Sequence, residues 1–418
     1  MTLNITTSWE QDTFAATEGS SHLVVTISAS ESAAGERAPV DLAFALDRSG
    51  SMGGEDKLEL VKEAVLAAVQ QLKPTDRVSL VTYDHEVQVL HRLTPLDAAH
   101  RARLERVTRR IEAGGMTNLS GGWLEACRQL SGDDADSTRV RRSLLLTDGL
   151  ANVGIIEPSE LNKHARELRD RGISTSAIGV GEGYDEFLLT SMAESGGGNS
   201  RYIAHTAELE AFFSEELRSL SEMVAINPYL DLTMPHGVTA ELINAFPTET
   251  HRRHTSVDVR DLAAGEQVDL VFAVTSRRVH GESIVPELHL HWTDPRTGSV
   301  AEINVEGAAI TVGDTSNAQR DDAAAEKVAL EMAARDDREA VKLDREGHFR
   351  ESRERFLQSA ARLQAAPDTD EIREVMRASQ ARGHMPASMA MPEHDRKTAV
   401  HDAHRRSRGG RRPQGEPR

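Results

Sequence analysis

Apolar residues in the first half of the chain fall into two alternating patterns. Short, nearly continuous apolar runs occupy residues 40–46 and 143–146, and small polar residues follow each run at once. Between these runs, apolar residues recur every three or four positions, as at Leu58, Val61 and Val65. Continuous runs are typical of buried strands, and the wider spacing is typical of helices with one buried face. The alternation predicts an α/β fold, with a doubly wound, mostly parallel sheet covered by helices on both faces.

The same alternation continues to about residue 223. Strands are expected at residues 77–83 and 173–180, with residues 87–90 as a hairpin edge, and helices at residues 119–130, 161–171, 187–193 and 209–223. Successive parallel strands joined by helices imply right-handed crossovers in one sheet. We therefore place an α/β domain at residues 38–222.

The segments on either side of this domain have the character of strands. Residues 22–29 are rich in β-branched side chains and lie between Gly- and Ser-rich turns. Beyond the α/β domain, strand candidates recur at residues 229–234, 255–259, 268–274, 288–292 and 309–312. This spacing favours an antiparallel β-sandwich over residues 224–315. A short hairpin is not stable alone, so we expect residues 1–36 to complete the sandwich, with the α/β domain inserted in it.

Helical spacing returns at residues 318–365, where Gly347 separates two apolar stripes. Residues 340–363 resemble one helical hairpin of the tetratricopeptide type, and a plain amphipathic helix pair fits the pattern equally well. Such a unit is too small to stand alone, so we expect it to pack on the sandwich. The pattern then fails, and residues 366–418 are expected to be a largely disordered basic tail.

Charge and cysteine content narrow the classes of partner and compartment. The chain has 418 residues and a net charge of -18. The segment from Arg396 onward carries eight basic and two acidic residues, a net of +6, which leaves -24 for the rest. An acidic body argues against nucleic-acid binding except through the basic tail. Cys127 is the only cysteine and lies in a helical pattern, so a buried structural thiol in a reducing compartment is expected.

The sequence shows no sign of secretion or membrane insertion. The first residues lack a basic segment followed by an apolar stretch, which argues against a signal peptide. No apolar run approaches the length of a membrane span. We therefore expect a cytoplasmic protein.

The candidate chemistry lies in three short polar pieces. The run Asp47-Arg48-Ser49-Gly50-Ser51 and the run Thr147-Asp148-Gly149 each follow a predicted strand, and Thr117 precedes a predicted helix. In parallel sheets, ligands bind at the carboxyl ends of strands where the strand order reverses. Two carboxylates and three hydroxyls can surround one Mg²⁺ or Mn²⁺, and a shell of oxygen alone argues against zinc. The candidate metal ligands are Asp47, Ser49, Ser51, Thr117 and Asp148.

In order and spacing, these five positions resemble the metal-ion-dependent adhesion site of the von Willebrand factor A domain family. The resemblance covers about residues 38–222 and is to a bacterial, intracellular type of member. It implies direct ligation by Ser49 and Ser51, with Thr117 joining them in a high-affinity state. It also implies that Asp47 and Asp148 act directly or through water, and that an open position accepts an Asp or Glu of a partner protein. Arg48 fills a variable position and is expected to influence which acidic partner binds.

The resemblance further implies a switch in which the last helix of the domain, at about residues 209–223, slides as the metal loops rearrange. That helix leads directly into the predicted sandwich, so its movement would reach a second domain. Nothing in the sequence itself indicates two states.

Three functions remain open at this stage. The first is a non-enzymatic, metal-dependent protein-binding module. The second is an adaptor for an AAA+ ATPase of the MoxR or chelatase type, whose A-domain subunits the site also resembles. The third is a signalling scaffold that uses the basic tail. The chain contains no nucleophile elbow, P-loop or zinc-protease motif, so we do not expect an enzyme.

One histidine pair lies outside these three pieces. His289 and His291 are two residues apart in a predicted strand, so their side chains point to the same face. That spacing can bind zinc, but the sequence indicates no third ligand. We expect an exposed strand face there.

Overall fold

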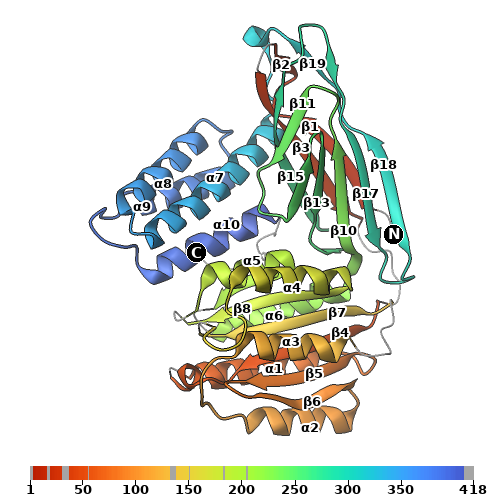
Figure 1. Ribbon diagram of the computed structural model, residues 1–418, viewed down its shortest axis with the longest axis vertical. Helices are drawn as coiled ribbons and strands as arrows, with labels where there is room; N and C mark the ends of the chain where they lie inside the picture. The colour runs from red at the N-terminus through yellow and green to blue at the C-terminus, as the bar shows by residue number, and fades with distance from the viewer. Residues whose placement is uncertain are drawn as a thin grey trace.

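The computed structural model describes residues 3–16, 19–30, 37–54, 56–131, 138–149, 151–181, 184–203 and 206–408. Three parts are visible in Figure 1: an α/β domain at one end, a set of mostly antiparallel sheets at the other, and a helical bundle beside them. Among these described residues, no helix combines the length and apolar character that a membrane crossing requires.

The α/β domain is built on one six-stranded sheet with the order β6-β5-β4-β7-β8-β9. Only β6 is antiparallel to its neighbour; the other pairs are parallel. The predicted α/β fold is therefore confirmed. Its strands are β4 (Val40–Asp47), β5 (Arg77–Tyr83), β6 (Val87–Pro95), β7 (Val140–Thr147), β8 (Ile173–Val180) and β9 (Gly197–Ile203). Its helical segments are η1 (Gly50–Gly53), α1 (Lys57–Gln71), α2 (Ala98–Arg109), α3 (Leu119–Leu130), α4 (Pro158–Asp170), α5 (Glu186–Ser195) and α6 (Thr206–Ser221).

Strand β4 is buried along its whole length because helices cover both faces of the sheet. Leu42 and Phe44 belong to the core that contains residues of α1 and α6. Ala43 and Ala45 face the other core, with α3, α4 and α5. Cys127 lies in this second core, where burial raises the pKa of its thiol to about 12, so the prediction of a buried thiol is confirmed.

Two antiparallel sheets form a sandwich around a single core. One contains β1 (Leu3–Trp9), β3 (Gly19–Ala29), β15 (Gln267–Ser276) and β11 (Val238–Leu242). The other contains β12 (Thr248–His251), β13 (His254–Asp258), β10 (Met223–Thr233), β17 (Glu287–Thr293) and β18 (Val300–Glu306), with β14 (Leu262–Ala263) paired to β10. A small third sheet contains β16 (Ser283–Ile284), β19 (Ile310–Gly313) and β2 (Thr13–Ala15). Because β3 pairs with β15, the α/β domain is an insertion between β3 and β10.

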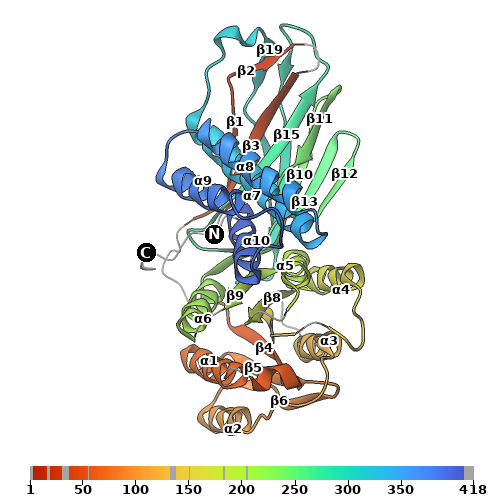
Figure 2. The ribbon, with the colours of Figure 1, turned by 90° about the vertical axis from the view of Figure 1, so that its left-hand side faces the viewer.

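The C-terminal part is a bundle of α-helices that packs beside the sandwich (Figure 2). Its elements are η2 (Thr315–Asn317), α7 (Asp322–Arg345), α8 (Phe349–Gln364), α9 (Asp370–Gly383) and α10 (Glu393–Ser407). Helices α7 and α8 form a hairpin whose turn contains Gly347 at φ 86°, a conformation that favours glycine. Ala324 and Val328 of α7 pack against Val24 and Val271 of the sandwich.

The prediction of a largely disordered segment at residues 366–418 is wrong for residues 370–407, which contain α9 and α10. Residues 409–418 lie outside the described part of the chain. Helix α9 buries Ile372 and Val375, and α10 buries Ala399 and Val400. The apolar stripes on these helices are narrow, and buried charged side chains complete their packing. A polar, charged composition of this kind predicts a disordered tail when the tertiary contacts are not known.

Helix α10 connects the bundle to the α/β domain through basic side chains. Lys397 is fully buried, donates to the carbonyl oxygen of Tyr184 at 2.8 Å and lies 3.8 Å from the centre of its ring. Arg396 pairs with Glu186 at 2.9 Å. His404 lies 3.0 Å from a carboxylate oxygen of Glu194. Lys397, Arg396 and His404 of the expected tail therefore have partners within the α/β domain.

Acidification is expected to weaken this junction through His401. Its Nε2 lies 3.0 Å from the hydroxyl of Tyr184, and its Nδ1 is shielded from solvent without a hydrogen-bond partner. Burial, then the positive charges of His404 and Arg201, lower the pKa of His401 to about 3. An unfolded histidine titrates near 6.5, so the unfolded chain takes up this proton first. The contribution of neutral His401 to the unfolding free energy is therefore complete above pH 6.5 and is lost as the pH falls toward 3.

The expected loss from this group between pH 7 and pH 5 is about 2 kcal/mol of unfolding free energy. Urea unfolding of the wild type and of His401→Gln at both pH values measures it. The variant keeps His404, so only the contribution of position 401 differs. Equal losses in both proteins would contradict the assignment.

Candidate metal centre

The two candidate carboxylates lie at the carboxyl ends of adjacent strands. Asp47 is the last residue of β4, and Asp148 directly follows β7, which pairs in parallel with β4. Strand β4 is the point from which the sheet grows in both directions, through β5 on one side and β7 on the other. The predicted location at a reversal of strand order matches this topology.

Hydrogen bonds connect the loop after β4, which carries Ser49 and Ser51, to the loop after β7, which carries Asp148. Asp47 Oδ1 accepts from the backbone N–H of Ser49 at 2.8 Å. The hydroxyl oxygens of Ser49 and Ser51 are 3.2 Å apart. Ser51 Oγ donates to Asp148 Oδ1 at 2.7 Å. Four of the five predicted ligands therefore form one contiguous set of oxygen atoms.

Thr117 reaches the same place from the loop before α3. The backbone N–H of Gly50 donates to the carbonyl oxygen of Gly115 at 3.0 Å, which joins the two loops. A Cβ atom at Gly149 would lie 3.3 Å from Thr117 Oγ1 and 3.7 Å from Ser51 Oγ. A glycine at position 149 thus lets the three loops approach closely. The structure brings all five predicted ligands together.

The burial of the candidate oxygen ligands favours a cation at this position. Asp47, Ser49, Thr117 and Asp148 are all at most 4% exposed, whereas Ser51 is exposed at the rim. Burial raises the pKa of Asp47 to about 6, against the lowering effect of hydrogen bonds from Thr147 and Ser49. A buried carboxylate is stabilised by a nearby positive charge. Because all the donors are oxygen atoms, the set fits a hard divalent cation such as Mg²⁺ or Mn²⁺.

Three further residues contact the predicted ligands and were not predicted themselves. Lys57 Nζ lies 3.0 Å from Asp148 Oδ2, so its ammonium group would compete with a divalent cation for this carboxylate. Thr147 Oγ1 donates to Asp47 Oδ2 at 2.6 Å. Asn152 accepts from the backbone N–H of Thr117 at 2.9 Å. Thr147 could have been found from its place beside Asp148 at the strand end; Lys57 and Asn152 carry no such local signal.

Arg48, predicted to contact the partner, is held by a carboxylate at the rim of the site. Its guanidinium pairs with Asp84 at 2.9 Å, and its side chain is 21% exposed while that of Asp84 is 3% exposed. Its backbone N–H donates to the carbonyl oxygen of Tyr83 at 2.8 Å. A role in partner selection stays a prediction, and it would require the exposed part of the guanidinium.

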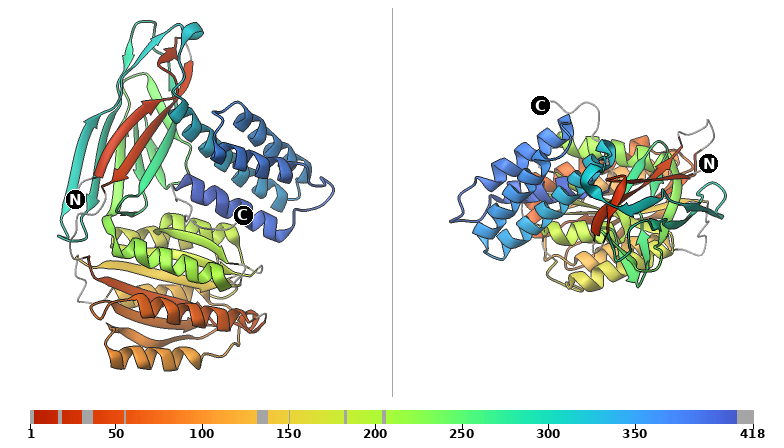
Figure 3. Two further views of the ribbon diagram at one scale, coloured as in Figure 1. Left: turned by 180° about the vertical axis from the view of Figure 1, so that it is seen from behind. Right: turned by 90° about the horizontal axis from the view of Figure 1, so that it is seen from above.

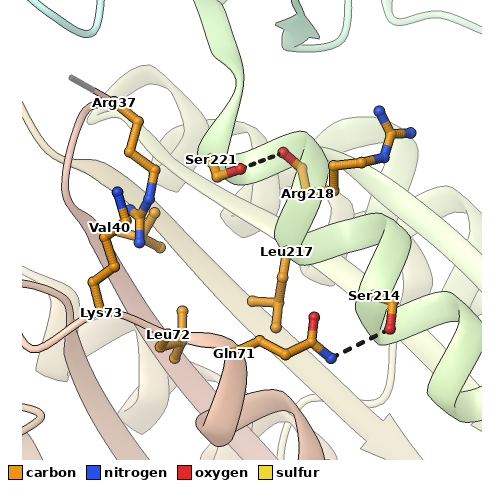
Figure 4. A pocket seen from close by; sticks show the side chains of 9 residues that line it. All are labelled: Arg37, Val40, Gln71, Leu72, Lys73, Ser214, Leu217, Arg218 and Ser221. Atoms are coloured by element: carbon orange, nitrogen blue, oxygen red, sulfur yellow. Dashed lines mark hydrogen bonds between the residues drawn. The ribbon is translucent and has the colours of Figure 1, made fainter. Parts of the chain in front are cut away.

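A cavity of about 320 Å³ lies at the opposite edge of the sheet, between the start of β4 and helices α1 and α6 (Figure 4). Gln71 donates to the hydroxyl of Ser214 across it at 3.2 Å. Strand β4 runs from Val40, which lines this cavity, to Asp47 at the metal loops. The cavity is therefore separate from the candidate metal centre.

We next compared the chain with known protein families. Residues 41–215 match the family described as von Willebrand factor type A domain. These residues form a von Willebrand factor A (VWA) domain. The matched segment begins at the second residue of β4 and ends within α6, so it covers the six-stranded sheet and the candidate metal loops. Domains of this family are generally protein-interaction modules and commonly bind a divalent metal at this site.

Known relatives resemble the chain beyond the VWA domain. The Escherichia coli protein YfbK is 28% identical over 241 residues, which cover 56% of this chain and 41% of that protein. The chain thus spans less than half the length of this curated relative. A solved von Willebrand factor type A structure from Catenulispora acidiphila has a TM-score of 0.71 at 20% identity, covering 89% of each chain. The ArnB paralog VWA2 from Sulfolobus acidocaldarius has a TM-score of 0.63 at 17% identity, covering 98% of this chain and 99% of that one. At these identities the two structures show a shared fold alone.

Proposed function

We propose that this chain is a non-enzymatic, metal-dependent protein-binding module. Its VWA domain would hold Mg²⁺ or Mn²⁺ and bind an Asp or Glu side chain of a partner protein. The observation that carries the proposal is the convergence of Asp47, Ser49, Ser51, Thr117 and Asp148 at one sheet edge. Hydroxyl ligands are neutral, so a cation held largely by them keeps positive charge for an incoming carboxylate.

The residues around the cation have distinct tasks in this proposal. Ser49 and Ser51 supply neutral oxygen ligands, and Thr117 can join them from the third loop. Asp47 receives hydrogen bonds from the Ser49 backbone and from Thr147, which fix the orientation of its carboxylate. The bound cation supplies the positive charge that recognises the partner. A cytoplasmic location is part of the proposal and is supported by the single, buried Cys127.

The helical bundle lies near enough to contribute to the partner surface. Tyr184 and Glu186 follow the carboxyl end of β8, the same sheet edge as the metal loops, and they contact Lys397 and Arg396 of α10. Helix α1 begins at Lys57, shortly after the metal loop that follows β4. Figures 1 and 3 show the bundle α7–α10 and the start of α1 on the same side of the molecule, which is the left-hand side in Figure 1. A partner bound at the metal would thus approach the bundle as well.

The alternative functions differ in how the structure supports them. An adaptor function for an AAA+ ATPase is compatible with the metal site, and the capture experiment below tests it. A scaffold role for the basic tail is disfavoured for residues 396–408. Arg396 pairs with Glu186, Lys397 with Glu393 at 3.2 Å, and Arg406 donates to Asp337.

Partner capture from a native lysate tests the proposal. Immobilised wild type in Mg²⁺ is expected to retain a protein that is absent with wild type in EDTA and with Asp47→Ala. Asp56→Asn is the matched control, because it removes an exposed carboxylate close in sequence to the metal loop but no predicted ligand. A retained protein with ATPase motifs would favour the adaptor function. The same captured proteins under all conditions would contradict metal-dependent recognition.

A further inference from the structure

A second cluster of metal-ligating side chains lies on the sandwich, remote in the fold from the VWA sheet edge. Strand β17 carries His289 and His291, and the adjacent antiparallel strand β10 carries Asp231. One ligand atom from each of these three residues lies within 4.8 Å of the other two. All three side chains are half-buried. The third ligand that the sequence did not indicate is thus supplied by strand pairing.

The pairing register explains why the three side chains meet. Asp231 lies directly opposite His289, and His291 lies two residues further along the same face of β17. The intervening Leu290 and its neighbours Leu288 and Trp292 point into the sandwich core. The cluster is therefore on the outer face of the sheet, and Figure 1 shows the helical bundle on the other side of the sandwich.

Neighbouring strands hold the three ligands in place. Ser256 of β13 donates to Asp231 Oδ1 at 2.5 Å, which orients the carboxylate. Glu302 of β18 lies 3.3 Å from Nε2 of His289. The ring of Tyr229 packs against His291 with centroids 5.0 Å apart. Such outer contacts are characteristic of metal sites, where they fix the orientation of imidazole and carboxylate ligands.

The charge of the cluster also favours a cation. Within the described residues, Asp231 forms no ion pair with Lys or Arg, and the ion pair found for Glu302 is the one with His289. Two carboxylates thus face two imidazoles without a permanent positive charge. Imidazole with carboxylate is a ligand set for Zn²⁺ and related transition metals, whereas Mg²⁺ prefers oxygen alone.

We propose that Asp231, His289 and His291 bind one Zn²⁺ ion on the outer face of the sandwich. Three protein ligands leave a fourth position of a tetrahedral site open. Glu302, 3.3 Å from Nε2 of His289, is placed to orient that imidazole. The site is distinct from the VWA metal centre in both location and ligand chemistry.

Titration calorimetry with ZnSO₄ on the full chain, free of affinity tags and in excess Mg²⁺, tests the proposal. Wild type and Asp47→Ala are expected to bind one equivalent of Zn²⁺ equally well. Asp231→Asn is expected to bind at least ~10-fold more weakly, and the double variant His289→Ala/His291→Ala to lose this binding. His251→Ala, on the exposed strand β12 of the same sheet, is the matched control and should bind like the wild type.

Two results would overturn the assignment. One is stoichiometric Zn²⁺ binding that persists in the double histidine variant. The other is no Zn²⁺ binding by the wild type beyond that of the double variant. Far-UV circular dichroism and thermal unfolding of the metal-free proteins control for folding. They should be unchanged in the variants, because the three side chains lie outside the sandwich core.

Discussion

Replacement of Asp148 by alanine is expected to weaken Mg²⁺ binding at the VWA site by more than ~100-fold, about 2.7 kcal/mol or more. Asp148 accepts from Ser51 through one carboxylate oxygen and from Lys57 through the other. Its loss removes one of two carboxylates at the site and the acceptor that positions the Ser51 hydroxyl. The remaining neutral hydroxyls bind a hard cation poorly without that charge.

Two readouts measure this loss. Titration with MgCl₂ gives the affinity, and a Mg²⁺-dependent rise in unfolding temperature reports binding to the folded state. Asp148→Asn keeps the shape and one oxygen but removes the charge, so its affinity should fall between those of wild type and Asp148→Ala. Asp56→Asn should behave as wild type. Wild-type affinity in Asp148→Ala would show that the cation, if bound, does not use this carboxylate.

Replacement of Arg142 by alanine is expected to lower the unfolding free energy by about 3–5 kcal/mol. Arg142 is 3% exposed, and it pairs with Glu216 of α6 at 2.8 Å and with Asp261 of the sandwich at 3.1 Å. Both carboxylates are 2% exposed. Removing the guanidinium leaves two buried negative charges without their cation, which costs more than the pairs themselves contribute.

The same arginine joins the VWA domain to the sandwich, so its loss should also make the unfolding of the two domains less cooperative. Urea unfolding followed by circular dichroism is expected to show an earlier transition than in the wild type, with Arg128→Ala as the control. Arg128 is 71% exposed and pairs with Glu125 on the surface, so this control should lose at most about 1 kcal/mol. A similarly small loss in Arg142→Ala would contradict a central role for the buried network.

The VWA sheet and its metal loops could be predicted because their signals are local. The short runs just before Asp47 and Thr147 are nearly continuously apolar, and in a parallel sheet the loops after such strands lie at one edge. The ligand types then specify a hard cation without knowledge of tertiary contacts. The convergence of Thr117 with these loops came from the family resemblance rather than from any local pattern.

Features that depend on distant pairing could not be predicted. Asp231 becomes a neighbour of His289 only through the register of β10 with β17, which no local pattern specifies. Lys57 reaches Asp148 across 91 positions of sequence. The sequence predicts a tail at helix α10 because the partners that bury it are distant in sequence: the bundle core for Ala399 and Val400, and the VWA domain for Lys397 and His404. Tertiary interactions there override a composition that resembles disorder.

The most direct test of the metal centre is anomalous X-ray diffraction from crystals of the full chain grown or soaked with MnCl₂. The account predicts an anomalous peak at coordination distance from the hydroxyl oxygens of Ser49 and Ser51, with Asp47 and Asp148 beside it. That peak should be missing in crystals of Asp148→Ala treated identically. Well-diffracting wild-type crystals with saturating Mn²⁺ and no peak between these side chains would contradict the central claim.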